Sequence, residues 1–187
     1  MTVTFPNIAT ELRTPRLLLR RPRVEDAEAM QEAITVSLPE LKVWMPWAHT
    51  PATLIDRREY IQASMERFQE GTELTYVIWS VNGETLLGNS SIHHLNWLVP
   101  KGEIGYWVAT PHTGQGYAQE AAQALTTLAL DTLGFRRIEI RCDALNERSA
   151  RIPRQLGFTL DAHFKNDDVA ADNPLKLRDT LVFSRVQ

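Results

Sequence analysis

One stretch, GYWVATPHTGQGYAQEAAQAL at residues 105–125, constrains the fold more than any other part of the sequence. It begins inside an apolar, strand-like run at 103–108 and ends inside a helical pattern that runs from about 116 to 133. A second strand-like run follows at 137–142. This order predicts a strand–helix–strand crossover. Such a crossover places a loop and a helix N-terminus at the carboxyl end of the first strand, where ligands usually bind.

The rest of the chain predicts a layered mixture of helices and strands, an α/β (α+β layered) fold. Apolar runs predict strands at 16–21, 75–81, 84–89 (continuing to about 95), 160–164 and 176–186, and Asn82-Gly83 predicts a hairpin. Helical periodicity predicts helices at 26–34, 53–69 and 148–156. Residues 1–12 are expected to form a loose leader, and residues 38–51, which contain three prolines, an irregular segment.

The composition predicts a single domain that spans residues 1–187. A chain of 187 residues with 43% hydrophobic side chains can bury a proper core. The net charge of -3 provides no general attraction to nucleic acid or to anionic membranes, and the arginines from Arg13 to Arg23 are interpreted as a solvated strand edge. The single cysteine, Cys142, excludes an intrachain disulfide. Because no targeting or bilayer-spanning segment is recognisable, we expect a cytoplasmic protein.

The small residues before the long helix predict an anion site. A helix N-terminus exposes unpaired N–H groups and carries a partial positive charge, and small residues let an anion approach them. A pyrophosphate cradle is therefore expected at Gly114, Gln115, Gly116, Tyr117 and Ala118, although glycines at this position also serve simply as turn residues. The stretch lacks the Gly-Lys-Ser/Thr of a nucleotide-hydrolysing loop and a complete dinucleotide fingerprint.

A second stretch, NERSARIPRQLGF at 146–158, follows the next strand and puts Asn146 and Ser149 at the mouth of another helix. Together the two stretches resemble the GNAT family of N-acetyltransferases, whose loop usually reads Arg/Gln-x-x-Gly-x-Gly/Ala. Thr113 departs from the usual first residue of that loop. The segments TPRLLLRRPRVEDAEAM, VWMPW, LLGNSSIHHLNW and EIGYWV are similar to the branch that acetylates ribosomal-protein N-termini (the RimJ/RimL type).

The resemblance implies a mixed, mostly antiparallel central sheet that is splayed at the cofactor cleft and covered by helices on both faces. It implies acetyl-CoA as co-substrate and no metal. Main-chain groups near Trp107 and Val108 would bond the pantetheine arm, Thr113 and the N–H groups up to Ala118 would hold the pyrophosphate, and Asn146 would bond the arm from the other wall.

The resemblance also implies catalytic candidates. Glu103, on the strand that lines the cleft, and Asp168, in a loop after residue 164, are the candidate bases, although both could be solvated surface charges. Many family members use a tyrosine to protonate the departing thiolate, but Pro153 stands at that position, which leaves Ser149 as the candidate acid. Alternatively, Ser149 is a helix cap.

The acceptor is expected to be the N-terminal α-amine of a protein or peptide, such as a ribosomal protein. A small-molecule amine (an antibiotic, polyamine or amino acid) and a non-catalytic CoA sensor remain alternatives, and either a monomer or a homodimer is compatible with the sequence. Trp44 and Trp47 are candidates for the acceptor wall, or else for core packing. His93 and His94 should face opposite sides of a strand, which makes them poor joint metal ligands.

Overall fold

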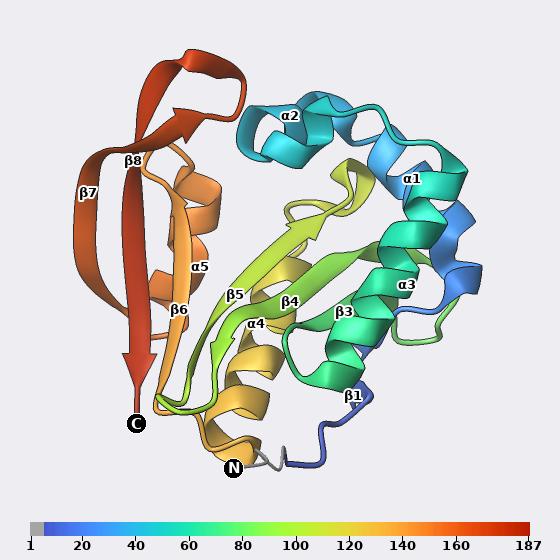
Figure 1. Ribbon diagram of the computed structural model, residues 1–187, viewed down its shortest axis with the longest axis horizontal. Coiled ribbons are helices and arrows are strands. Elements are labelled where there is room, and N and C mark those ends of the chain that lie inside the picture. Colours follow the sequence, from blue (N-terminus) through green and yellow to red (C-terminus); the bar gives the residue numbers. More distant parts are fainter. Residues whose placement is uncertain (1–5) are drawn as a thin grey trace.

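The computed structural model describes residues 6–187 as an eight-stranded sheet covered by helices (Figure 1). The strand order is β1-β2-β3-β4-β5-β6-β8-β7, and every neighbouring pair is antiparallel except β5 and β6. The strands are β1 Glu11–Arg13, β2 Leu17–Arg20, β3 Leu74–Ser80, β4 Leu86–Asn96, β5 Lys101–Val108, β6 Arg137–Asp143, β7 Thr159–Ala170 and β8 Asn173–Val186. The α-helices are α1 Ala27–Thr35, α2 Leu38–Trp44, α3 Leu54–Glu70, α4 Tyr117–Thr127 and α5 Glu147–Gln155. No helix in this part of the chain is long and apolar enough to cross a membrane.

Two hydrophobic clusters lie on the two faces of the sheet. Along β2, Leu17 and Leu19 belong to the cluster that includes α4, whereas Leu18 belongs to the cluster that includes α1. Tyr76 and Val77 divide between the same two clusters along β3. Successive side chains of a strand point to opposite faces, so these fully apolar runs need helices on both sides. The expected layered α/β fold is therefore confirmed.

The crossover predicted from the glycine-containing stretch is confirmed. Strand β5 leads through α4 to β6, and the two strands run parallel. They pair only over Lys101–Glu103 and Arg137–Glu139, after which they diverge (Figure 1). The N-terminus of α4 consequently lies at the carboxyl end of β5, beside the opening between the strands.

The long helix differs from expectation in its hydrogen bonding. Helix α4 ends at Thr127 and continues as a π-helical turn, η4 Leu128–Thr132, in which the Leu133 N–H donates to the Leu128 carbonyl at 2.9 Å. Gly134, with φ of 72°, then adopts the left-handed conformation that ends the segment.

Three sequence expectations need correction. Part of the expected loose leader forms β1, which pairs with β2, and the Tyr76 hydroxyl donates to the Ala9 carbonyl at 2.6 Å; residues 1–5 lie outside the described part. The segment expected to be irregular contains α2 and the 3-10 helix η2 Pro46–His49, because proline at the first positions of a helix removes an N–H that has no intrahelical acceptor. Strand β7 extends to Ala170, so Asp168 lies on a strand and not in a loop.

Candidate active site

A cavity of about 760 Å³ opens between the diverging strands β5 and β6 and is walled on the other side by the segments around α1, α2 and α3. Six of the predicted site residues line it: Trp44, Trp47, Glu103, Trp107, Asn146 and Ser149. Asp168 and Val108 are not among the lining residues, and the loop from Thr113 to Ala118 lies at the N-terminus of α4. The tertiary structure thus brings together both walls of the cleft and the candidate acceptor residues.

The loop before α4 has the open backbone that a pyrophosphate requires. Gly114 and Gly116 have φ of 77° and 82°, in the region that favours glycine. A Cβ atom built on Gly114 would meet nothing within 4 Å, and one on Gly116 would meet only Arg16 Nη2, at 3.3 Å. The N–H groups of the first helical turn have no intrahelical acceptor, so the loop can accept the diphosphate of coenzyme A.

Arg16 holds this loop in place, a role that the sequence did not indicate. Its Nη1 donates to the Gln115 carbonyl at 2.7 Å, and its Nε pairs with the Glu120 carboxylate at 2.6 Å. Its guanidinium also lies 4.9 Å from the centre of the Tyr117 ring. The sequence interpretation assigned this arginine to a solvated strand edge. Its contacts with the loop could not be recognised locally, because they join residues more than ninety positions apart.

Tyr106, on β5, and Ser149, near the start of α5, form a polar pair in the cleft. The Tyr106 hydroxyl donates to the Ser149 carbonyl at 3.2 Å and lies 3.3 Å from Ser149 Oγ. Burial raises the pKa of Tyr106, and it raises the pKa of the neighbouring Cys142 thiol to about 11, so both groups keep their protons at neutral pH. The helix-capping role considered for Ser149 belongs instead to Asn146, whose Oδ1 accepts the Ser149 N–H at 3.0 Å.

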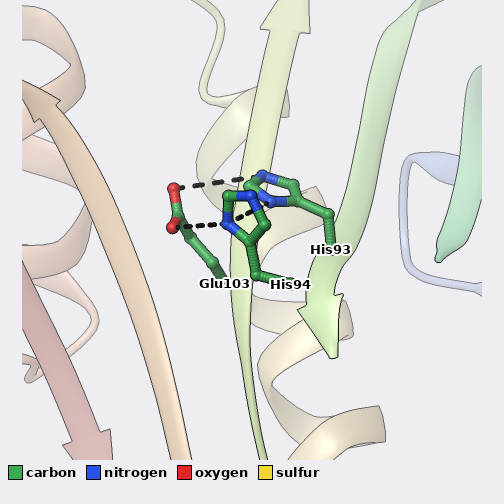
Figure 2. Close-up of side chains that lie close together, drawn as sticks. All are labelled: His93, His94 and Glu103. Carbon is green, nitrogen blue, oxygen red and sulfur yellow. Dashed lines mark hydrogen bonds and ion pairs between the residues drawn. The ribbon is translucent and has the colours of Figure 1, made fainter. Parts of the chain in front are cut away.

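Glu103 lies beside two imidazoles (Figure 2). Its carboxylate is 3.3 Å from His94 Nδ1 and 4.0 Å from His93 Nε2, and the two Nδ1 atoms are 3.2 Å apart. The expectation that the histidines face opposite sides is wrong, because His94 has a φ of 50° next to an irregularity in the β4–β5 register. Burial lowers the pKa of His93, so this ring is neutral at neutral pH. One possible metal-ligating atom from each of these three residues lies within 4.8 Å of the other two.

Asp168, the other candidate base, pairs with Arg178. The two residues face each other across β7 and β8, and Asp168 Oδ2 lies 2.9 Å from Arg178 Nη2. This hydrogen bond lowers the pKa of Asp168. Arg178 itself lines the cleft, whereas Asp168 does not.

The tryptophans form an open wall. Trp47 is 41% exposed and its ring centre lies 6.2 Å from that of Trp107, in a tilted arrangement. Core packing, the alternative considered for this residue, therefore does not describe Trp47. The cleft also contains residues that the sequence analysis did not single out: Arg57, Tyr106 and Arg178. No local pattern marks them, since they come from α3, β5 and β8.

Comparisons with known proteins agree with this geometry. The model of the acetyltransferase (GNAT) domain matches residues 16–159. The chain is 30% identical over 142 residues (76% of this chain and 77% of the relative) to the "Putative ribosomal N-acetyltransferase YdaF" of Bacillus subtilis (strain 168). It is 27% identical over 135 residues (70% and 74%) to the ribosomal-protein-serine acetyltransferase of Escherichia coli (strain K12).

Solved structures share the fold. RimL, a ribosomal alpha-N-protein acetyltransferase in complex with coenzyme A, superposes with a TM-score of 0.85 at 22% identity, covering 92% of this chain and 95% of that one. The microcin self-immunity acetyltransferase MccE, in complex with acetyl-CoA and AMP, gives a TM-score of 0.86 at 21% identity, covering 93% and 94%. The family match spans most of the sequence and includes both walls of the cleft. The chain belongs to the GNAT acetyltransferase family and is an acetyl-CoA-dependent N-acetyltransferase.

Proposed function

We propose that the cleft acetylates the N-terminal α-amine of a protein or peptide, with ribosomal proteins the class that the relatives' names suggest. The observation that carries this proposal is the position of Glu103, whose side chain is 16% exposed on the cleft wall beside a neutral imidazole. A carboxylate is a weak base, and an α-amine needs no stronger one.

The free-energy cost of deprotonation separates the two classes of protein amine. An α-amine has a pKa of about 7.7–8.0 and a lysine about 10.4, so forming the neutral amine at pH 7 costs about 1 kcal/mol for the former and nearly 5 kcal/mol for the latter. Glu103 would take the proton from the amine and pass it toward His94, whose side chain is 78% exposed. The same carboxylate would serve a lysine poorly.

The remaining roles belong to residues on both sides of the cleft. Acetyl-CoA, when bound, supplies an acetyl group activated as a thioester. The loop from Thr113 to Ala118 would hold its diphosphate, and the main chain near Trp107 and Val108, with Asn146 opposite, would hold its arm. Ser149, oriented by Tyr106, would donate a proton to the thiolate that leaves. Asp168 stays a second candidate base, although its ion pair with Arg178 weakens it.

A small-molecule amine is the second candidate acceptor. The cavity of about 760 Å³ lies within the range of about 300–1,000 Å³ typical of small-molecule pockets, and Trp44 and Trp47 supply the apolar wall such sites use. A ribosomal N-terminus would enter the same space as an extended segment.

An acetyl-transfer screen tests the proposal. Peptides that begin with Ala, Ser or Met are compared with N-terminally blocked peptides that contain lysine, and with free small amines, while thiol release is followed. We expect the unblocked peptides to have the highest kcat/KM. Turnover of small amines alone would favour the second candidate, and coenzyme A binding without turnover of any amine would indicate a CoA sensor.

A further inference from the structure

Arg57, near the start of α3, is a buried cation on the cleft wall. The residue is 9% exposed, and its Nε donates to Gln31 Oε1 at 3.3 Å. Among residues 6–187, no carboxylate forms an ion pair with its guanidinium. The adjacent Asp56 carboxylate instead accepts hydrogen bonds from Thr53, at 2.6 and 2.7 Å. The guanidinium of Arg57 thus contacts the Gln31 amide oxygen and lies 5.7 Å from the centre of the Tyr60 ring.

This position is unfavourable for a positive charge in three respects. The residue is largely removed from water, the neighbouring Asp56 carboxylate attracts it only from beyond ion-pair distance, and it lies near the positive end of a helix dipole. Burial lowers the pKa of Arg57 accordingly, although an arginine remains charged in proteins. A glutamine or leucine of similar size would avoid these costs, so a structural role alone does not account for the arginine.

Arg178 brings a second incompletely satisfied guanidinium to the same cavity. Its Nη2 pairs with Asp168, but its Nε is buried and has no hydrogen-bond partner among the described residues. A buried donor without a hydrogen-bond partner is unfavourable. Arg57 and Arg178 come from α3 and β8, and both line the same cleft.

Guanidinium groups bind carboxylates and phosphates through two parallel hydrogen bonds. We propose that Arg57 and Arg178 make this an acceptor site for amines whose own molecule carries an anionic group, a carboxylate or a phosphate. The inference rests on the proposed function and narrows it: a peptide acceptor has an acidic or phosphorylated side chain close to its N-terminal amine.

Matched pairs of acceptors test the proposed preference for an anionic group. Peptides with Asp at the second, third or fourth residue are compared with the same peptides carrying Asn, and a phosphoserine peptide with its serine counterpart. Amino acids and their amides form the small-molecule arm. A charged hydrogen bond contributes about 1.5–3 kcal/mol, so at least one anionic acceptor should exceed its neutral counterpart in kcat/KM by about 10-fold or more, mainly through a lower KM.

Variants locate the effect. Arg57→Gln and Arg178→Gln should each reduce the preference for the anionic acceptor to within about threefold of unity, which is under 1 kcal/mol. Arg58→Gln removes the same charge one position along α3, from an exposed side chain that pairs with Glu28, and should leave the preference unchanged. A thermal shift with acetyl-CoA checks that each variant is folded.

The outcomes separate this inference from the proposed function. If neutral and anionic acceptors are acetylated equally well, the anion site is wrong while the acetylation of amines stands. If no amine is acetylated, calorimetry of each peptide pair on the protein saturated with coenzyme A still measures the preference. Equal affinities there would overturn the inference, and tighter binding of the anionic peptide would support it.

Discussion

At the scale of single residues, Glu103 carries the proposed chemistry. Its carboxylate lies on the cleft wall, where we expect it to take a proton from a bound amine. General-base catalysis typically contributes about 10²–10⁴-fold, and we expect Glu103→Gln to lower kcat/KM at neutral pH by at least about 100-fold. The measurement is the pH dependence of kcat/KM for the best peptide acceptor.

Asp168→Asn is the matched comparison for Glu103→Gln. It also removes one carboxylate charge, but from a residue that does not line the cleft and that pairs with Arg178. A pH profile that moves with Asp168→Asn and not with Glu103→Gln would transfer the role of base to Asp168.

The burial of His93 leads to a prediction about how the free energy of unfolding depends on pH. Burial, partly opposed by the Glu103 carboxylate, lowers its pKa from 6.5 in the folded protein. The unfolded chain therefore binds a proton at a pH where the folded protein does not, and the free energy of unfolding decreases as the pH falls below 6.5. Urea unfolding above and below this pH should show a smaller decrease for His93→Gln than for the unmodified protein.

His49→Gln is the comparison for this experiment. It also replaces one histidine by glutamine, but at an exposed position that does not line the cleft. If the free energy of unfolding of His93→Gln depends on pH as in the unmodified protein, the pKa of His93 does not differ between the folded and unfolded states.

At the scale of elements, we expect the start of α5 to combine a structural role with a functional one. The Asn146 side chain caps the helix at Ser149 N–H and also lines the cleft. Asn146→Ala should lower the free energy of unfolding by about 1 kcal/mol, as the loss of a helix N-cap typically does, and should weaken coenzyme A binding. Denaturant unfolding and calorimetry measure the two effects.

Asn146→Ser separates the two roles. Serine is a comparable N-cap but has no amide to reach the cofactor arm, so stability should return while affinity for coenzyme A stays reduced. Recovery of both would show that Asn146 acts on the cofactor only through the helix.

The accuracy of the sequence predictions also varied from element to element. Helix α3 was predicted to within a residue or two at each end, because both ends carry strong local signals: Thr53 starts the helix with a capping box, and Gly71 ends it as a left-handed C-cap. Helix α2 was missed because three prolines in 38–51 outweighed its weak periodicity. The full length of β7 was missed because exposed polar residues continue it, held by their pairing with β8 and not by burial.

At the scale of the whole molecule, binding of acetyl-CoA should stabilise the folded protein. A ligand at about 100 times its Kd adds about 2.7 kcal/mol, which for a chain of this size raises Tm by about 5–11 °C. Gly116→Val should abolish this shift, because a side chain at φ of 82° strains the loop and occupies the space for the diphosphate.

Gly134→Val is the matched control. Gly134 has φ of 72° at the far end of the same helical segment, so valine there should lower the Tm of the free protein but preserve the shift with acetyl-CoA. A shift that survives in Gly116→Val would place the diphosphate elsewhere.

The sequence by itself determined the crossover, the glycine loop before α4 and the family, because glycines, caps and apolar periodicity act over a few residues and can be recognised locally. Only the tertiary structure decided what meets in the cleft. Arg57 and Arg178 are separated by more than a hundred positions, and His94 reaches Glu103 only through a backbone conformation that the β4–β5 pairing imposes. Such contacts depend on how strands and helices pack, and packing is a property of the folded chain.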